Sequence, residues 1–154
     1  MPSDRFYAKL SRSLGVRGLR LWGKLNVPVY RASGGRVGGK MGRAPVLLLT
    51  TTGRKSGEKR TTPVVYLEDD GRFSVINTNA ANRIPSWSRN LDANPEAEVE
   101  VGRLRMAVRA RPAEGEERAE LWRKHNAQYS GFDEYKAILP DDRPITVYVL
   151  EPRQ

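Results

Sequence analysis

Two β-rich runs that flank a short turn between two glycines constrain this chain more than any other feature. The first run covers Val46–Thr52, the turn is Gly53–Gly57, and the second run covers Glu58–Leu67. Apolar and β-branched residues dominate both runs, and a turn of this length joins neighbouring strands, so the sequence predicts an antiparallel hairpin. The fold must therefore contain a sheet that is built by local pairing.

The tip of this predicted hairpin is strongly cationic. It carries Arg54, Lys55, Lys59 and Arg60, and only Glu58 opposes them. Glycines let backbone N–H groups approach a ligand, and Lys and Arg form charge-assisted hydrogen bonds with phosphate and carboxylate oxygens. The tip therefore indicates an anion-binding turn. The alternative is a solvated turn whose charges keep a sheet edge soluble.

The turn does not match the phosphate-binding loop of nucleoside triphosphatases. Only three residues separate Gly53 from Gly57, where that motif has four, and Glu58 stands where it requires lysine. A strand rather than a helix is also expected to follow. An anion bound here would use a different geometry.

The positive charge of the chain is concentrated at one end. The 154 residues carry a formal net charge of +9. Residues 1–43 hold ten Lys or Arg and a single acidic residue, whereas residues 44–154 hold seventeen basic and seventeen acidic residues. We therefore expect a basic arm at residues 1–43 attached to a neutral domain at residues 44–154, which is large enough for one hydrophobic core.

The arm shows the pattern of a basic amphipathic helix over residues 6–25. Apolar residues recur at helical spacing, and Arg and Lys occupy the other face. This pattern suits an anionic membrane surface, and it also suits a helix packed on the core of the protein itself. DNA binding is a weaker interpretation because the arm has few aromatics for stacking. Pro28 is expected to end the helix, and the glycine-rich residues 33–42 are expected to form a mobile connector or lid without regular structure.

The rest of the chain alternates further strands with two helices. The patterns predict strands at residues 72–77, 98–101, 104–111 and 145–150, helices at 85–91 and 114–128, and a short helical turn at 133–139. About six antiparallel strands joined mostly by hairpins indicate a mainly β, α+β fold, a small barrel with helices outside it. A doubly wound parallel sheet is disfavoured because the hairpins leave too few crossover helices.

Composition argues against several kinds of chemistry. The chain has no cysteine and a single histidine, His125. Thiol nucleophiles, disulfides and thiolate metal sites are therefore excluded, and we expect no metal site. His125 stands in a charged helical stretch, where a surface position is expected. The longest apolar run, Val46–Leu49, is far shorter than the ~20 residues that span a bilayer, and no signal-peptide pattern precedes it. We therefore expect a cytoplasmic protein, which would be peripherally membrane-associated if the arm binds lipid.

Five ordered blocks of this sequence resemble the deazaflavin-dependent nitroreductase family. The blocks lie at residues 47–57, 60–63, 85–95, 117–122 and 150–152, and the resemblance runs from about residue 31 to the end. It implies a split β-barrel that binds reduced coenzyme F420, a deazaflavin with a phosphodiester and an oligoglutamate tail. It also implies reduction of quinones, nitro compounds or other electron-poor acceptors.

The resemblance places the phosphodiester at the hairpin tip and the deazaflavin ring in a slot of the barrel. The cofactor-binding residues that it implies are Arg54, Lys55, Ser56, Gly57, Arg60, Thr62, Pro63, Val64, Thr78 and Trp87. For Trp87 the alternative is a core anchor of a short helix, and for Pro63 it is a residue that only shapes the strand at an edge or bulge.

The cofactor itself would carry the hydride, so no acid–base pair need stand out. The catalytic residues implied by the resemblance are Thr78, Tyr129 and Tyr135. Relatives commonly carry three tyrosines in this region, but the middle position here is Phe132, and Ser88 replaces the aromatic residue that follows Trp87 in many of them. These departures leave the acceptor open.

Two alternatives to a reductase remain at this point. One is a carrier that holds F420 without turnover, and the other is a split-barrel protein that binds flavin mononucleotide. The expected partners are a small-molecule acceptor and, through the arm, an anionic membrane surface, with no nucleic acid. The chain is expected to be a monomer or a homodimer.

Overall fold

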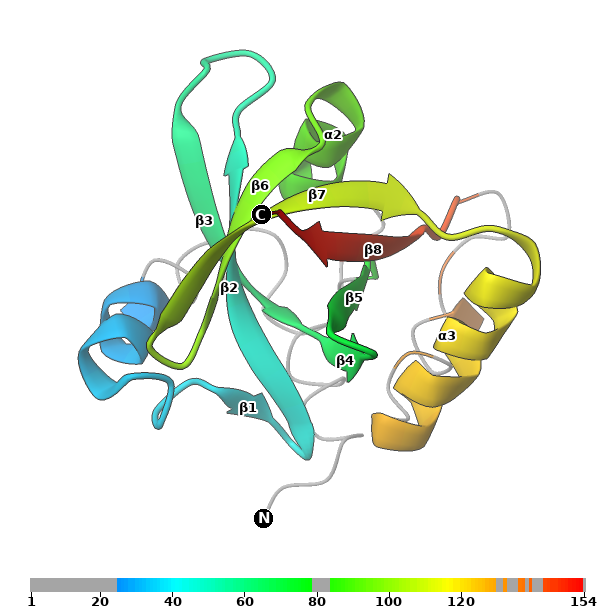
Figure 1. Cartoon of the computed structure of the whole chain (residues 1–154), viewed down its shortest axis with the longest axis horizontal. Coiled ribbons are helices and arrows are strands. Elements are labelled where there is room, and N and C mark those ends of the chain that lie inside the picture. Colours follow the sequence, from blue (N-terminus) through cyan, green and yellow to red (C-terminus); the bar gives the residue numbers. More distant parts are fainter. Residues whose placement is uncertain are drawn as a thin grey trace.

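The strands form one antiparallel sheet that curls into a half-barrel (Figure 1). The computed structural model describes residues 25–78, 84–129, 132, 136–137, 139 and 143–153. The neighbouring strands follow the order β1-β2-β6-β7-β8-β5-β4, and β3 pairs with β2. The strands are β1 (Lys40–Met41), β2 (Ala44–Thr52), β3 (Lys59–Val65), β4 (Leu67–Asp69), β5 (Arg72–Ile76), β6 (Glu96–Val101), β7 (Leu104–Pro112) and β8 (Val147–Pro152), and the helices are α2 (Ser86–Ala93) and α3 (Gly115–Gln128). The predicted split β-barrel with flanking helices is confirmed.

The hairpin that the sequence predicts first is present as β2 and β3. Its register runs from Val46 opposite Val65 to Thr52 opposite Lys59. The second predicted hairpin is present as β6 and β7, with Val101 opposite Leu104. Both follow from the alternation of apolar and polar residues, which gives each strand one buried face.

The predicted strand at residues 58–67 is broken, which raises the number of strands above six. It forms β3 and β4, with Tyr66 between them, and the backbone N–H of Tyr66 donates to the carbonyl of Pro45 at 3.1 Å. As a result β3 pairs with β2, whereas β4 pairs with β5. A straight strand cannot serve both partners in a strongly curled sheet, so the chain bends where it passes from one to the other.

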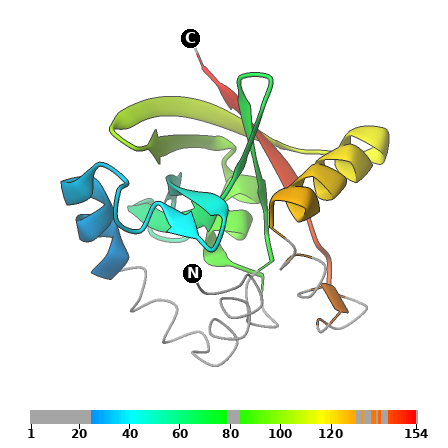
Figure 2. The same cartoon turned by 90° about the horizontal axis from the view of Figure 1, so that it is seen from below.

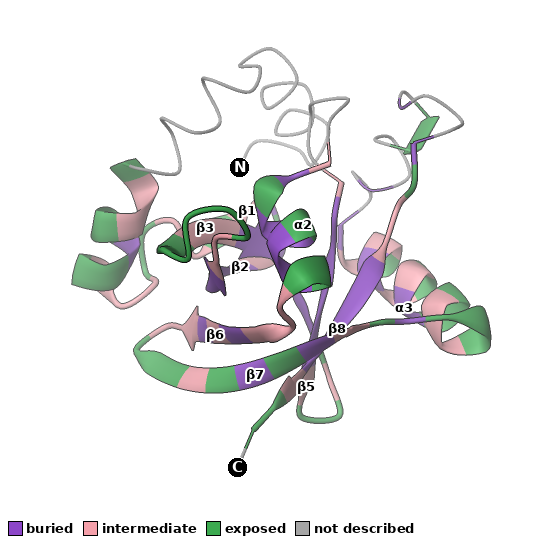
Figure 3. Ribbon diagram, turned by 90° about the horizontal axis from the view of Figure 1, so that it is seen from above, coloured by how far each residue is buried: buried purple, intermediate pink, exposed green. Residues whose placement is uncertain are grey.

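The sheet buries a different hydrophobic cluster on each face. Alternate residues of one strand enter different clusters: Tyr148 and Leu150 of β8 face the barrel interior, while Val147 and Val149 face α3. The period of two along a strand produces this division. Figure 3 shows buried residues along most of β8, as expected for a strand covered on both sides. Burial on both faces makes β8 a rigid centre of the half-barrel.

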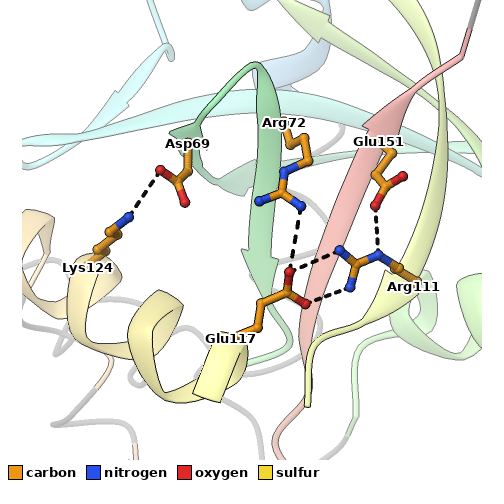
Figure 4. A network of polar contacts seen from close by, with 6 residues as sticks. All are labelled: Asp69, Arg72, Arg111, Glu117, Lys124 and Glu151. Carbon is orange, nitrogen blue, oxygen red and sulfur yellow. Dashed lines mark hydrogen bonds and ion pairs between the residues drawn. The ribbon is translucent and has the colours of Figure 1, made fainter. Parts of the chain in front are cut away.

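Ion pairs hold α3 against the sheet (Figure 4). Arg111 of β7 contacts Glu117 at 2.6 Å and Glu151 at 2.7 Å, and Lys124 contacts Asp69 at 3.1 Å. The hydrogen bonds to Arg111 hold the pKa of Glu117 below its usual value. Because these charges are partly exposed, each pair contributes modestly, but together they set the position of the helix.

His125 is buried, so the expected surface position is wrong. Its ring is 0% exposed, and Nε2 lies 3.0 Å from the hydroxyl of Ser74 on β5. Desolvation by burial lowers the pKa of His125 to about 4, which keeps the imidazole neutral at physiological pH. Leu121 and His125 are one turn apart and form the buried face of α3. The charged residues around His125 in the sequence belong to the other faces of the helix.

Residues 25–33 are helical and pack on the barrel, so the predicted helix end at Pro28 is wrong. Proline removes one backbone donor, and the residues after it keep theirs, so the helix continues to residue 33. Figures 1 and 2 both show this helix beside the turn between β6 and β7. The segment 33–42 is not without structure either, because it contains β1, and the Ser33 side chain accepts a hydrogen bond from Val37 N at 3.0 Å.

The predicted amphipathic arm at residues 6–25 lies almost wholly outside the described residues. Its division from a domain at residues 44–154 stays a prediction. Of the described helices, none is long and apolar enough to cross a membrane.

Candidate functional site

The turn between β2 and β3 has a defined backbone geometry. Gly53 N donates to the carbonyl of Glu58 at 2.7 Å, and Gly57 N donates to the carbonyl of Gly53 at 2.8 Å. Gly57 has a φ of +73°, a conformation that residues with a Cβ rarely adopt, and the space beside it is open. The Ser56 hydroxyl accepts a hydrogen bond from Glu58 N at 3.1 Å. Figure 1 shows this turn projecting beyond the sheet, with α2 beside it.

The predicted cationic residues meet at this tip with their side chains exposed. Arg60 pairs with Glu58 at 3.2 Å, and Lys59 donates to the hydroxyl of Thr52 at 3.2 Å. Arg54 donates to the side-chain oxygen of Asn90 on α2 at 3.0 Å. Only one of these partners carries a negative charge. The tip therefore presents an excess of positive charge to solvent.

The predicted ring-binding residues of β3 lie further along the same strand. Thr62, Pro63 and Val64 stand opposite Leu49, Leu48 and Leu47 of β2. Within the described residues β3 pairs with β2 alone, so Pro63, which has no N–H, lies in an edge strand where no donor is missed. This is the alternative in which Pro63 shapes the strand. A contact between Pro63 and the cofactor stays a prediction.

Trp87 belongs to the hydrophobic core inside the barrel. It is 8% exposed and shares a cluster with Val64. Its ring packs edge-to-face on Tyr148, with centroids 5.7 Å apart. The structure thus shows the core anchor that was one of the two interpretations, and direct contact between Trp87 and a cofactor ring stays a prediction.

Thr78 follows β5 at a point where the backbone is firmly held. The preceding residue, Asn77, accepts from Thr146 N at 2.7 Å, donates through Nδ2 to Ser88 at 3.0 Å, and accepts through its carbonyl from Arg143 at 2.7 Å. The hydroxyl of Thr78 itself is buried and has no hydrogen-bond partner in the part of the chain that the structure describes. Buried hydroxyls are normally paired, so this one is suited to a ligand atom.

A buried polar network that the sequence did not predict lies beneath α2. The Tyr148 hydroxyl contacts the Ser88 hydroxyl at 2.5 Å and donates to Asp92 at 2.9 Å. Burial raises the pKa of Tyr148 to about 12, so the phenol stays protonated. The only sequence signal was Ser88 itself, a small polar residue where relatives carry an aromatic one. The structure explains it, because the hydroxyl sits between Tyr148 and Asn77.

Of the two predicted tyrosines, the structure describes Tyr129, which lies on the other side of the sheet at the end of α3. Tyr129 is 1% exposed, and its ring packs edge-to-face on Phe132 at 5.5 Å. Phe132 also packs against His125 at 5.3 Å and Trp122 at 6.5 Å. Phe132 therefore fills an aromatic cluster. Tyr135 lies outside the described residues.

The described residues contain no group of three acidic or histidine side chains that could hold a metal ion. A small hollow beside α3 is lined by Asp69, Arg72, Phe73, Ser74, Leu121 and Val149. None of the predicted site residues lines it. The candidate site is therefore the cationic tip together with the nearby β3, Thr78 and α2.

Residues 22–152 match the F420H(2)-dependent quinone reductase family. The chain belongs to this family. An F420H(2)-dependent quinone reductase of Mycobacterium tuberculosis is 36% identical over 149 residues, which covers 94% of this chain and 96% of that protein. Family membership confirms the expected deazaflavin-dependent oxidoreductase and its cofactor, coenzyme F420.

Two solved structures also resemble this member of the quinone reductase family. The F420-H2 dependent reductase FDR-A is 35% identical, with a TM-score of 0.62 over 70% of this chain and 94% of that one. A structure described as a domain-swapped dimer is 31% identical, with a TM-score of 0.63 over 83% of this chain and 95% of that one. Both support the split-barrel fold.

The residues present suit the anionic, ring-bearing cofactor of the family. Three exposed cations, Arg54, Lys55 and Arg60, meet an anion's need for charge-assisted donors, and Gly57 leaves open space beside them. Thr78, which follows β5, adds a buried hydroxyl that has no hydrogen-bond partner among the described residues. The two features come from separate parts of the chain.

Proposed function

We propose that this protein transfers a hydride from reduced F420 to a quinone. The observation that carries the proposal is that one half-barrel has both an exposed cationic tip and a buried hydroxyl, that of Thr78, with no hydrogen-bond partner among the described residues. When bound, reduced F420 supplies the hydride. The protein supplies position and exclusion of water.

The tip residues have the task of holding the anionic part of the cofactor. Arg54, Lys55 and Arg60 donate charge-assisted hydrogen bonds, and the backbone near Ser56 and Gly57 adds N–H donors. Each such bond contributes about 1.5–3 kcal/mol when it is shielded from water, and less at an exposed turn.

The barrel residues have the task of orienting the ring. Thr62, Pro63 and Val64 form one wall, Trp87 supports the opposite wall, and the Thr78 hydroxyl fixes the ring by a hydrogen bond. Val64 and Trp87 both pack in the buried core cluster, so the core beneath the proposed ring site holds these two residues in place. A rigid slot keeps the donor and the acceptor carbon at reacting distance.

Protonation of the reduced quinone needs a donor, and Tyr129 and Tyr135 are the predicted candidates. Phe132, which replaces the middle tyrosine of many relatives, has no proton to give, and Tyr129 is buried in the cluster beside α3, away from Val64 and Trp87. The proposal therefore assigns the proton to Tyr135: Tyr135→Phe should lower kcat more than it raises KM for the quinone, and Tyr129→Phe should change kcat little.

The test is oxidation of reduced F420, followed by its absorbance, with menadione as the quinone and a nitroaromatic compound as a second acceptor. Turnover with menadione supports the proposal, and turnover with the nitroaromatic would extend it to nitro reduction. Binding of F420 without oxidation by either acceptor would support a carrier instead. A purified protein that is yellow and shows flavin absorbance would support flavin mononucleotide.

We also propose that the protein associates with an anionic membrane surface, where quinones reside. The exposed large apolar residues of the described chain are Leu25, Val29, Val37 and Leu104. They belong to the helix at 25–33, the turn after it and the adjacent β6–β7 turn, and Arg36 and Arg103 add positive charge there. Apolar residues among cations suit a lipid interface.

Flotation with vesicles that contain anionic lipid tests this surface. We expect cofloating that weakens in the Leu25→Ser, Leu104→Ser double variant and disappears with zwitterionic vesicles. Retention by DNA in a gel shift, without cofloating, would contradict it.

For the assembly we propose a homodimer, by analogy with the domain-swapped relative, and light scattering of the purified protein tests it.

A further inference from the structure

One residue of α2, Asn90, reaches across to the cationic tip. Its side chain is 2% exposed. Oδ1 accepts two hydrogen bonds from Arg54, one from the backbone N–H at 3.2 Å and one from the guanidinium Nη1 at 3.0 Å. Nδ2 donates to the hydroxyl of Thr51 on β2 at 3.1 Å. A single buried amide thus joins helix, strand and turn.

The paired contacts on Arg54 fix its backbone and its side chain at once. An arginine loses considerable rotamer freedom when it is immobilised, and here most of that loss occurs on folding rather than on binding. Because Oδ1 uses both of its lone pairs on Arg54, the geometry is specific to an amide or carboxylate at this position.

The partner is also electrically neutral. Asn90 orients the guanidinium without cancelling its charge, and no ion pair of Arg54 occurs among the described residues. Arg60 differs, because it pairs with the carboxylate of Glu58 at 3.2 Å. The guanidinium of Arg54 keeps further N–H groups that are not used by Asn90, and it lies at the surface.

We propose that Asn90 is a positioning residue that holds Arg54 ready to receive an oxyanion of the cofactor. The inference rests on the proposed function, because the ligand is F420. It goes beyond it by naming Arg54, rather than Lys55 or Arg60, as the preorganised member of the tip and Asn90 as the reason. The oxyanion belongs to the phosphodiester or to a glutamate carboxylate of the tail.

A set of three ligands separates these sources. The probes are F420, a truncated F420 that keeps the phosphodiester but has no glutamates, and the deazaflavin nucleoside that ends before the phosphate. Asn90→Ala should weaken binding of F420 by about fivefold to tenfold, which is the loss expected when a charge-assisted bond is disordered. An equal loss for the truncated F420 assigns the contact to the phosphodiester, and a loss for full-length F420 alone assigns it to the tail.

Binding of the deazaflavin nucleoside distinguishes a positioning role of Asn90 from a purely structural one. If Asn90 acts through Arg54, Asn90→Ala leaves nucleoside binding unchanged within twofold. In the Arg54→Ala background the same substitution should add less than twofold to the loss for F420, because there is no guanidinium left to position. Asn94→Ala, which removes a hydrogen bond to Glu96 at the end of the same helix, is the matched control and should affect no ligand selectively.

Asn90→Asp keeps the shape of the side chain and covers the case in which the alanine variant does not fold. Its carboxylate would pair with Arg54, so F420 binding should fall further than in Asn90→Ala at low salt, and the deficit relative to the unmutated protein should shrink as salt is raised. Equal weakening of all three ligands, or a full effect of Asn90→Ala without Arg54, would overturn the proposal. Failure of the unmutated protein to bind any of the three would instead overturn the proposed function, and the inference with it.

Discussion

The hydroxyl of Tyr30 accepts a hydrogen bond from the backbone nitrogen of Gly102 at 3.0 Å, across 72 residues of sequence. The same oxygen lies 3.1 Å from the carbonyl of Val46 and 3.2 Å from that of Glu100. Tyr30 is 1% exposed, and burial raises the pKa of its hydroxyl. One side chain therefore fastens the helix at 25–33 to both β2 and the β6–β7 hairpin.

Tyr30→Phe should destabilise the protein by about 1–2 kcal/mol, because it removes the acceptor of the partly buried Gly102 N–H and the hydrogen bond to the buried carbonyl of Val46. Urea unfolding measures the change. Arg31→Ala is the control: it removes a half-exposed ion pair with Glu100 and should cost less than about 1 kcal/mol. Equal effects of the two substitutions would show that the Tyr30 contacts do not anchor the helix.

Thr78→Val should separate cofactor affinity from stability. The hydroxyl has no partner among the described residues, so an isosteric apolar side chain should keep or raise the free energy of unfolding, by up to about 1 kcal/mol. Binding of F420 should weaken, and Thr78→Ser should retain it. Thermal unfolding and cofactor titration test the pair of effects. Unchanged affinity in Thr78→Val would remove Thr78 from the site.

Glu58→Gln should strengthen F420 binding, because it removes the negative charge beside the turn and releases Arg60 from the one ion pair that it makes among the described residues. We expect a gain of about twofold to fivefold at low salt, which shrinks as salt screens the exposed charges. Lys55→Ala should act in the opposite direction and reduce the salt dependence of binding. Glu68 is an exposed acidic residue on β4, and Glu68→Gln is the control. It should change neither the affinity for F420 nor its salt dependence.

The stability of the protein should fall as the pH drops from about 6.5 to about 4, because His125 is buried in its neutral form. The pKa of its imidazole is lowered to about 4 in the folded state and stays near 6.5 in the unfolded chain. The unfolded state therefore binds more protons within this window, and stability is present in full above pH 6.5. The loss approaches about 1.4 kcal/mol per pH unit inside the window.

His125→Gln removes this titration and is the measurement that checks it. Unfolding free energies of both proteins should be compared from pH 7.5 to 4.5, where carboxylates contribute equally to each and cancel in the difference. A difference that does not change with pH would show that His125 titrates normally.

The hairpins and the short helix before Pro95 were predictable because their signals are local. Apolar alternation defines each strand, and glycines mark the turns between them. The cationic tip was predictable for the same reason, since Arg54, Lys55 and Arg60 lie close together in the sequence. Contacts between distant residues were not predictable. The break at Tyr66 depends on β5, and the burial of His125 depends on Ser74.

The contacts that hold the site residues in place were also not predictable from the sequence. Nothing near Asn90 in the sequence indicates that its amide faces Arg54, and nothing near Ser88 indicates Tyr148. The positions of Asn77 and Thr78 depend on Thr146 and Arg143 in the same way. Asn77, Thr78, Ser88 and Asn90 are all small polar residues. Their local sequence therefore fits a surface helix or loop as well as a buried network.

The sequence by itself determined the two main hairpins, the charge of the tip and the family. These depend on the identity and spacing of residues close together in the chain. Only the tertiary structure decided that Arg54 is held by Asn90, that the Thr78 hydroxyl has no partner among the described residues and that His125 is buried in its neutral form. Those properties depend on desolvation and on partners that folding brings from far along the chain, and local composition does not encode either.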